Sequence, residues 1–119
     1  MPDRAGSPPA QKRSRARLRK FRSPLCEGVN TEEPVFTGGL ADAPFGVKRC
    51  IVDVGASLPL DRHAEREVWV VTQGRGVLVY QGETSELQQG DMVAFDPDVP
   101  HEFSNTASEP FELVSIYWA

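Results

Sequence analysis

Residues 55–74 read Gly-Ala-Ser-Leu-Pro-Leu-Asp-Arg-His-Ala-Glu-Arg-Glu-Val-Trp-Val-Val-Thr-Gln-Gly and hold one of the chain's two histidines, His63. Side chains alternate faces along an extended strand, so Asp61, His63 and Glu67 can point to one side. The other histidine, His101, lies 34 positions after Glu67. Imidazole nitrogens and carboxylate oxygens are ligands for divalent first-row metal ions. The two histidine-containing stretches therefore predict a metal site.

The spacing of these residues resembles the first motif of the cupins, G-x5-H-x-H-x3,4-E-x6-G. Gly55, His63, Glu67 and Gly74 stand at its positions without a gap. Asp61 stands where the family usually has its first metal-binding histidine.

A second stretch resembles the second cupin motif, G-x5-P-x-G-x2-H-x3-N. Gly90, His101 and Asn105 match it, whereas Asp96 and Asp98 replace its proline and glycine. Both motifs occur in the family's order, and the resemblance covers roughly residues 35–119. It implies an all-β fold, an antiparallel jelly-roll barrel, and a structural hydrogen-bonding role for Asn105.

The resemblance also implies a divalent metal ion as cofactor, held by His63, Glu67 and His101. Two histidines and one carboxylate with open positions suit Fe(II), and oxygen-rich sets favour Fe(II) or Mn(II), with Zn and Ni as alternatives. Asp61 is either a fourth ligand, a residue that orients His63 or a bound water, or a general base. Asp61 and Glu67 are the candidate catalytic residues. The alternative is a barrel that has lost its metal.

Short apolar runs separated by Gly, Pro and Asp predict about eight strands and no long helix. The clearest are residues 47–54, 67–72, 77–81, 84–87, 92–95, 101–105 and 111–118. Residues 73–76, Gln-Gly-Arg-Gly, predict a hairpin between two of them. In 47–54 and 111–118 either face could be buried.

Two further residues are weaker candidates for substrate contact. Arg49, if it faces inward, could pair with a substrate carboxylate, although Lys48 could occupy that face instead. The alternative for Arg49 is an ordinary surface position. Tyr80 is the other candidate, and its alternative is a place in the core.

Charge divides the chain into two parts. Residues 1–34 carry eight Lys or Arg and four Asp or Glu, whereas residues 35–119 carry five and thirteen. We expect residues 1–34 to form a basic arm, largely disordered or partly helical, and residues 35–119 to form the barrel. An acidic barrel does not suit nucleic acid as its main ligand.

Other features predict the setting in which the protein acts. No secretory signal or apolar run of about 20 residues is present, so we expect a cytoplasmic protein without a membrane segment. Cys26 and Cys50 are then expected as reduced thiols. A barrel of this size buries a low fraction of its surface, which favours a homodimer.

The resemblance leaves two functions open. The first is a metal-dependent enzyme acting on a small oxygenated metabolite, by oxygenase or by isomerase or cyclase chemistry typical of secondary metabolism. The second is a non-catalytic cupin that binds or senses a small molecule. The fold alone does not choose between them.

Overall fold

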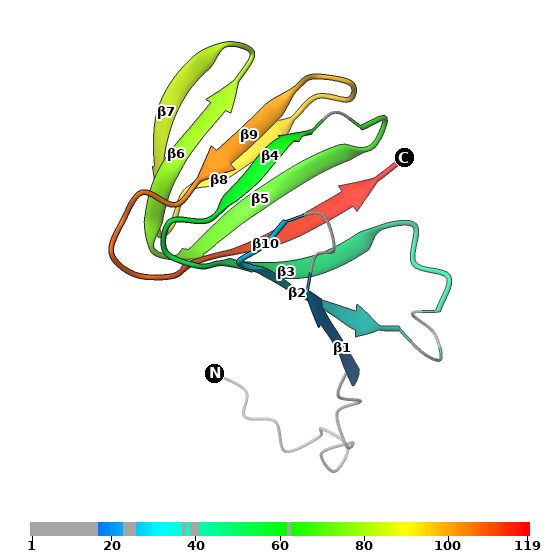
Figure 1. Ribbon diagram of the computed structural model, residues 1–119. Coiled ribbons are helices and arrows are strands. Elements are labelled where there is room, and N and C mark those ends of the chain that lie inside the picture. The colour runs from blue at the N-terminus through cyan, green and yellow to red at the C-terminus, as the bar shows by residue number, and fades with distance from the viewer. Residues whose placement is uncertain (1–16, 23–25, 37, 39–40, 62) are drawn as a thin grey trace, which may run out of the picture.

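The computed structural model describes residues 17–22, 26–36, 38, 41–61 and 63–119, and excludes the side chains of residues 21, 22, 60 and 61. Within this part the chain forms ten strands joined by turns (Figure 1). They are β1 (Arg17–Arg22), β2 (Val29–Val35), β3 (Gly46–Val52), β4 (Ser57–Asp61), β5 (Arg66–Gln73), β6 (Arg75–Tyr80), β7 (Glu83–Gln88), β8 (Met92–Phe95), β9 (His101–Ser104) and β10 (Phe111–Trp118). The described part contains no helix with the length and apolar character needed to cross a membrane.

The strands form two antiparallel sheets that face each other as in a jelly roll (Figure 1). The larger sheet has the order β1-β2-β3-β10-β5-β8, and the smaller has the order β4-β9-β6-β7. Consecutive strands often lie in opposite sheets, because β4 and β6 belong to the small sheet while β3 and β5 belong to the large one. This topology confirms the predicted all-β class.

The core lies between the sheets and is built by alternation. Phe111 and Leu113 of β10 are almost completely buried, and the ring of Phe103 from β9 lies 4.1 Å from that of Phe111, centroid to centroid. Burying a side chain of this size stabilises the fold by about 1.5–3 kcal/mol. The structure thereby resolves both open choices of face. Phe111, Leu113 and Ser115 of β10 point inward, and so do Cys50 and Val52 of β3.

The turn after β5 differs from the prediction. Residues 73–76 were expected to make a hairpin, but β5 pairs with β10 and β8, whereas β6 pairs with β7 and β9. The turn carries the chain from one sheet to the other. Gly74 has φ +84°, and a Cβ there would lie 2.7 Å from the carbonyl oxygen of Pro110. The connection between the two sheets therefore requires glycine at position 74. Because a hairpin turn also favours glycine, the sequence did not distinguish the two kinds of connection.

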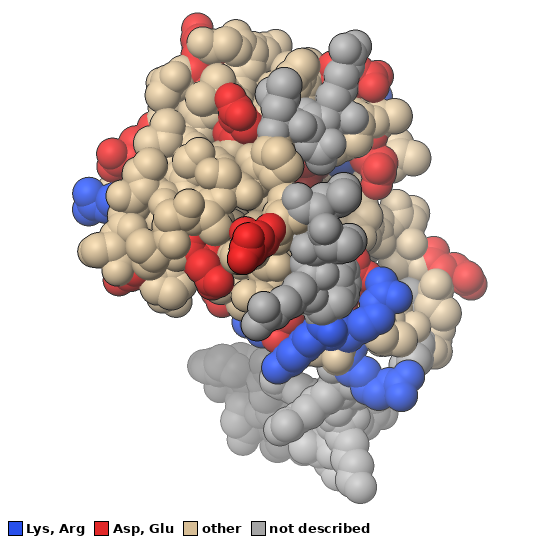
Figure 2. Space-filling model, viewed as in Figure 1, with Lys and Arg blue, Asp and Glu red and all other residues tan. Residues whose placement is uncertain are grey.

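The N-terminal region also differs from the expected arm. Residues 17–22 and 29–35 are strands of the large sheet, paired along six positions from Arg17↔Val35 to Arg22↔Asn30. Arg19 pairs with Glu33 across these strands, at 2.6 Å between Nη2 and Oε2. Figure 2 shows most of the Lys and Arg side chains of this face gathered near β1. Residues 1–16, the first part of the predicted arm, lie outside the described residues.

Candidate metal centre

Three predicted ligands converge between the two sheets. His63 lies in the connection between β4 and β5, Glu67 is the second residue of β5, and His101 is the first residue of β9. One potential ligand atom from each lies within 4.8 Å of the other two. Glu67 and His101 are buried, and His63 is half-buried. We call these three residues the triad.

The distances within the triad suit a small cation. Nε2 of His63 lies 3.0 Å from Oε1 of Glu67, and Nε2 of His101 lies 3.6 Å from the same oxygen. Ligands about 2.1 Å from a divalent ion are separated by roughly 3.0–3.4 Å when they subtend about 90–110°. The observed spacing is close to that range.

Each triad residue has its second polar atom anchored by the protein. Nδ1 of His63 lies 3.0 Å from the carbonyl oxygen of Glu65, and Nδ1 of His101 lies 3.2 Å from that of Val99. A carbonyl only accepts, so in the neutral ring Nδ1 carries the hydrogen and Nε2 keeps a free lone pair. Such second contacts fix the ring orientation of metal-binding histidines.

Ser115 performs the same task for Glu67. Its hydroxyl donates a hydrogen bond to Oε2 of Glu67, which leaves Oε1 directed at the two imidazoles. Two nitrogen lone pairs and a carboxylate oxygen then face one point. That arrangement is repulsive unless a positive charge lies between them, so the triad fits a divalent metal ion.

Aromatic side chains cover the triad from inside the barrel. The ring of His101 stacks on Phe95, with centroids 4.4 Å apart and planes 26° apart. Trp69 contacts His101 edge-on at 5.9 Å. These apolar walls keep bulk water from the inner side and lower the local dielectric, which strengthens metal–ligand attraction.

A cavity of about 320 Å³ opens beside the triad. It is lined by residues from strands of both sheets, namely Cys26, Val29, Thr31, Lys48, Cys50, Leu58, Pro59, His63, Glu67, Trp69, His101, Glu102 and Leu113. Both cysteines are free thiols. Burial raises the pKa of the Cys50 thiol, which favours the neutral form at neutral pH.

The remaining predicted site residues take different places. Asp61 ends β4, and its backbone pairs with that of His101, but its side chain lies outside the described part. Its role as ligand or base stays a prediction. Tyr80 contacts Phe95 edge-on at 5.2 Å, and its hydroxyl accepts a hydrogen bond from the Asp96 N–H at 2.9 Å. It is absent from the described cavity lining.

Arg49 lies on the face of β3 opposite the cavity. Its guanidinium pairs with Glu32 of β2, and Nε donates to Oε1 at 2.5 Å. The alternation of β3 instead directs Lys48 and Cys50 to the cavity. The inward basic residue is therefore Lys48, the alternative that the sequence left open.

Asn105 has the structural role expected from its motif position. Its Nδ2 donates to the carbonyl oxygens of Val52 and Glu109, at 3.0 and 2.9 Å, and its Oδ1 accepts from the Ala107 N–H at 3.0 Å. It closes the loop before β10. The contact of Ser115 with Glu67 was not predicted from the sequence. A hydroxyl on the same strand face as Phe111 and Leu113 could have indicated a buried polar contact.

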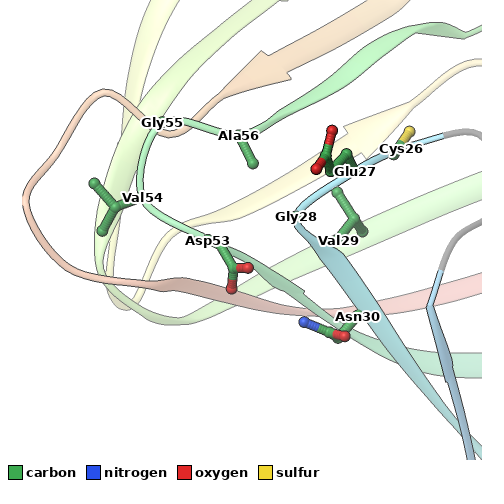
Figure 3. A pocket seen from close by; sticks show the side chains of 9 residues that line it. All are labelled: Cys26, Glu27, Gly28, Val29, Asn30, Asp53, Val54, Gly55 and Ala56. Atoms are coloured by element: carbon green, nitrogen blue, oxygen red, sulfur yellow. The ribbon is translucent and has the colours of Figure 1, made fainter.

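A second hollow, of about 510 Å³, lies where the start of β2 meets the connection between β3 and β4 (Figure 3). The carboxylates of Glu27 and Asp53 come from different segments and stand apart (Figure 3). Among the described residues, the triad is the cluster able to hold a metal ion. The larger hollow thus lacks the chemistry of the smaller cavity.

Comparison with known proteins agrees with this architecture. An uncharacterised protein of Methanocaldococcus jannaschii is 30% identical over 74 residues, which are 58% of this chain and 59% of the relative. The match thus spans less than two thirds of that relative's length.

Solved structures resemble the chain over most of its length. A cupin 2 conserved barrel domain protein from Salinispora arenicola is 25% identical with TM-score 0.69, covering 93% of this chain and 87% of the other. The polyketide cyclase RemF from Streptomyces resistomycificus has TM-score 0.71 at 19% identity, covering 91% and 79%. The cyclase thus shares the fold.

A family model, that of the cupin domain, matches residues 48–117. The matched segment includes every member of the triad as well as Lys48 and Ser115. Together with the two facing sheets, this match establishes the family. The chain belongs to the cupins.

Proposed function

We propose that this cupin is a metal-dependent enzyme acting on a small oxygenated metabolite. The observation that carries the proposal is the convergence of Nε2 of His63, Nε2 of His101 and Oε1 of Glu67, each with its other polar atom already bonded. This preorganisation holds the donor atoms in place before an ion arrives. A site so arranged supports metal binding as a function rather than as an accident of packing.

Two imidazoles and one carboxylate leave coordination positions open, and this donor set favours Fe(II) or Mn(II). When bound, such an ion supplies Lewis-acid polarisation of a substrate oxygen or, as iron, activation of O₂. The protein's own contribution is to orient the donors through Ser115 and two carbonyls and to exclude water with Trp69 and Phe95. Asp61 is proposed as a further ligand or as the base.

The size of the cavity supports a small substrate. Its volume of about 320 Å³ lies at the lower end of the range for small-molecule pockets, about 300–1,000 Å³. RemF is a polyketide cyclase with the same fold, but at 19% identity the likeness shows a shared fold and does not show a shared reaction. We therefore keep the reaction within oxygenase, isomerase or cyclase chemistry.

Glu67→Ala tests the metal centre, with Glu65→Ala as its matched control. Glu65 is exposed and uses only its backbone carbonyl toward His63. Metal-free protein is titrated with Mn²⁺ or, without oxygen, Fe²⁺ by calorimetry. We expect one ion per chain for wild type and Glu65→Ala. Glu67→Ala should bind more than about 100-fold more weakly, since outer contacts alone account for 10–100-fold.

Failure of wild type to bind either ion would reject the proposal. Turnover is then assayed with a panel of small oxygenated metabolites. A loaded protein that binds members of the panel and converts none of them would favour the non-catalytic alternative, a binding or sensor cupin.

A further inference from the structure

Lys48 is a cation on the inner face of the large sheet. It lies on β3 between Gly46 and Cys50, and it lines the same cavity as the triad. Among the described cavity-lining residues it is the single Lys or Arg, while Glu67 and Glu102 are acidic. A positive charge at this position is unexpected in a part of the chain that is strongly acidic overall.

The ammonium of Lys48 is supported by an aromatic ring. Its Nζ lies 5.5 Å from the centroid of the Tyr117 ring, within the range of a cation–π contact. Tyr117 lies directly over Gly46, where any Cβ would collide with the ring. Glycine at position 46 therefore makes room for the ring on which the Lys48 side chain rests.

Among the described side chains, Lys48 has no carboxylate partner, unlike its cationic neighbours. Arg19, Lys20 and Arg49 of the same sheet each pair with a glutamate. Within the described part of the chain, no Asp or Glu oxygen lies within 4.0 Å of Lys48 Nζ. A bound anion would supply a counter-charge to this ammonium through a charge-assisted hydrogen bond.

The sheet register relates Lys48 to the triad. Lys48 lies opposite Ser115 of β10, and Ser115 in turn holds Glu67 on β5. Strands β3, β10 and β5 are neighbours in this order. Two strand spacings, about 10 Å, thus separate the strands that carry Lys48 and Glu67. Because Lys48 and the triad line one cavity, one small molecule in that cavity can contact both.

We propose that Lys48 binds a carboxylate at one end of the substrate while oxygens at the other end face the triad. The proposal rests on the proposed function and adds the substrate class, a small acid with a polar chelating group at its far end. Lys48 thereby selects compounds with a carboxylate at the end far from the chelating group over compounds of the same length that lack it.

The test compares two ligands of equal length, 2-oxoadipate and 2-oxohexanoate, which differ in a terminal carboxylate against a terminal methyl. Homologues one carbon shorter and one longer form two further pairs. Dissociation constants are measured by calorimetry on the full chain, with and without Mn²⁺. Variants are Lys48→Met and Lys48→Gln, and the matched control is Lys20→Met, which removes the same charge on β1.

Wild type and Lys20→Met should bind at least one carboxylate-ended probe about tenfold more tightly than its methyl-ended partner. Both Lys48 variants should lose this preference and keep wild-type affinity for Mn²⁺, which shows that the triad is intact. Equal binding of every pair by wild type, including no binding of any, would overturn the proposal. So would a preference that survives in both Lys48 variants.

The metal-free titrations separate this inference from the proposed function. If wild type binds no Mn²⁺ yet keeps a Lys48-dependent preference for carboxylate-ended probes, the metal proposal fails and the anion site stands. If Mn²⁺ binds and the preference is absent, the anion site fails and the metal centre stands.

Discussion

At the scale of single residues, the geometry of the site depends on the polar atoms of the triad that point away from its centre and bond to the protein. Nδ1 of His63 and of His101 each bonds to a backbone carbonyl, and Oε2 of Glu67 accepts a hydrogen bond from the Ser115 hydroxyl. The sequence motifs predicted that His63, Glu67 and His101 lie together, because the motifs specify residue type and spacing, and the three do converge. They did not indicate Ser115, because it lies 48 positions from Glu67 and meets it only through sheet pairing.

We expect Ser115→Ala to weaken metal binding about tenfold. The substitution removes the hydrogen bond that holds Oε2 of Glu67, and outer contacts of this kind contribute 10–100-fold to metal affinity. Calorimetric titration with Mn²⁺ measures the change. Ser115→Thr retains the hydroxyl and serves as the control, although its added methyl group enters a fully buried position. Unchanged affinity in Ser115→Ala would show that the carboxylate is held by other contacts.

At the scale of elements, seven strand segments followed directly from apolar alternation and turn residues. Strands β5, β8 and β10 agree with their expected ranges within one residue at each end. Strand β1 did not follow, because Arg17–Arg22 contains four Lys or Arg and has no apolar face. It pairs with β2 along six positions, and Glu33 and Glu32 of β2 supply counter-charges to Arg19 and Lys20.

Glu32 joins three strands of the large sheet. It pairs with Arg49 of β3 and with Lys20 of β1, the latter at 3.3 Å between Nζ and Oε2. The hydrogen bond from Arg49 is the main cause that holds the pKa of Glu32 below its usual 4.5. The folded state therefore binds fewer protons than the unfolded state, so this stabilisation is present above pH 4.5 and is lost as the pH falls through the lowered pKa.

Glu32→Gln should accordingly destabilise the protein at pH 7 and lose most of that effect at low pH. Thermal unfolding followed by circular dichroism from pH 7 to pH 3 measures the difference between variant and wild type. Glu33→Gln makes the same chemical change at the exposed pair with Arg19, where we expect less than about 1 kcal/mol. A loss of thermal stability in Glu32→Gln that stays constant from pH 7 to pH 3 would show that it does not come from the charge of the Glu32 carboxylate.

At the scale of the whole molecule, the triad connects the two sheets. Glu67 belongs to the large sheet and His101 to the small one, and β5 and β9 have no strand pairing with each other. A bound ion therefore stabilises the closed arrangement of the barrel by mass action. The homodimer expected from the small size of the barrel stays a prediction, and size-exclusion chromatography with light scattering measures it.

Chelation should lower the melting temperature of the loaded protein. An ion present at 100 times its dissociation constant adds about 2.7 kcal/mol of stability, which corresponds to roughly 10 °C for a domain of this size. Calorimetric scans with and without a chelator measure the shift. His101→Ala should show no shift, because it lacks a ligand from the small sheet. A chelator that leaves fully loaded wild type unchanged would refute a stabilising role for the ion.

The placement of the triad in two sheets also sets the order in which its members appear during synthesis of the chain. A nascent chain that has emerged as far as β8 contains His63 and Glu67 but lacks β9 with His101 and β10 with Ser115. The triad and the hydroxyl that holds Glu67 are complete only once β9 and β10 have been made and have paired within their sheets. Under the proposed function, metal binding would therefore come after β9 and β10 have been made and have paired with their neighbours, later than the appearance of His63 and Glu67.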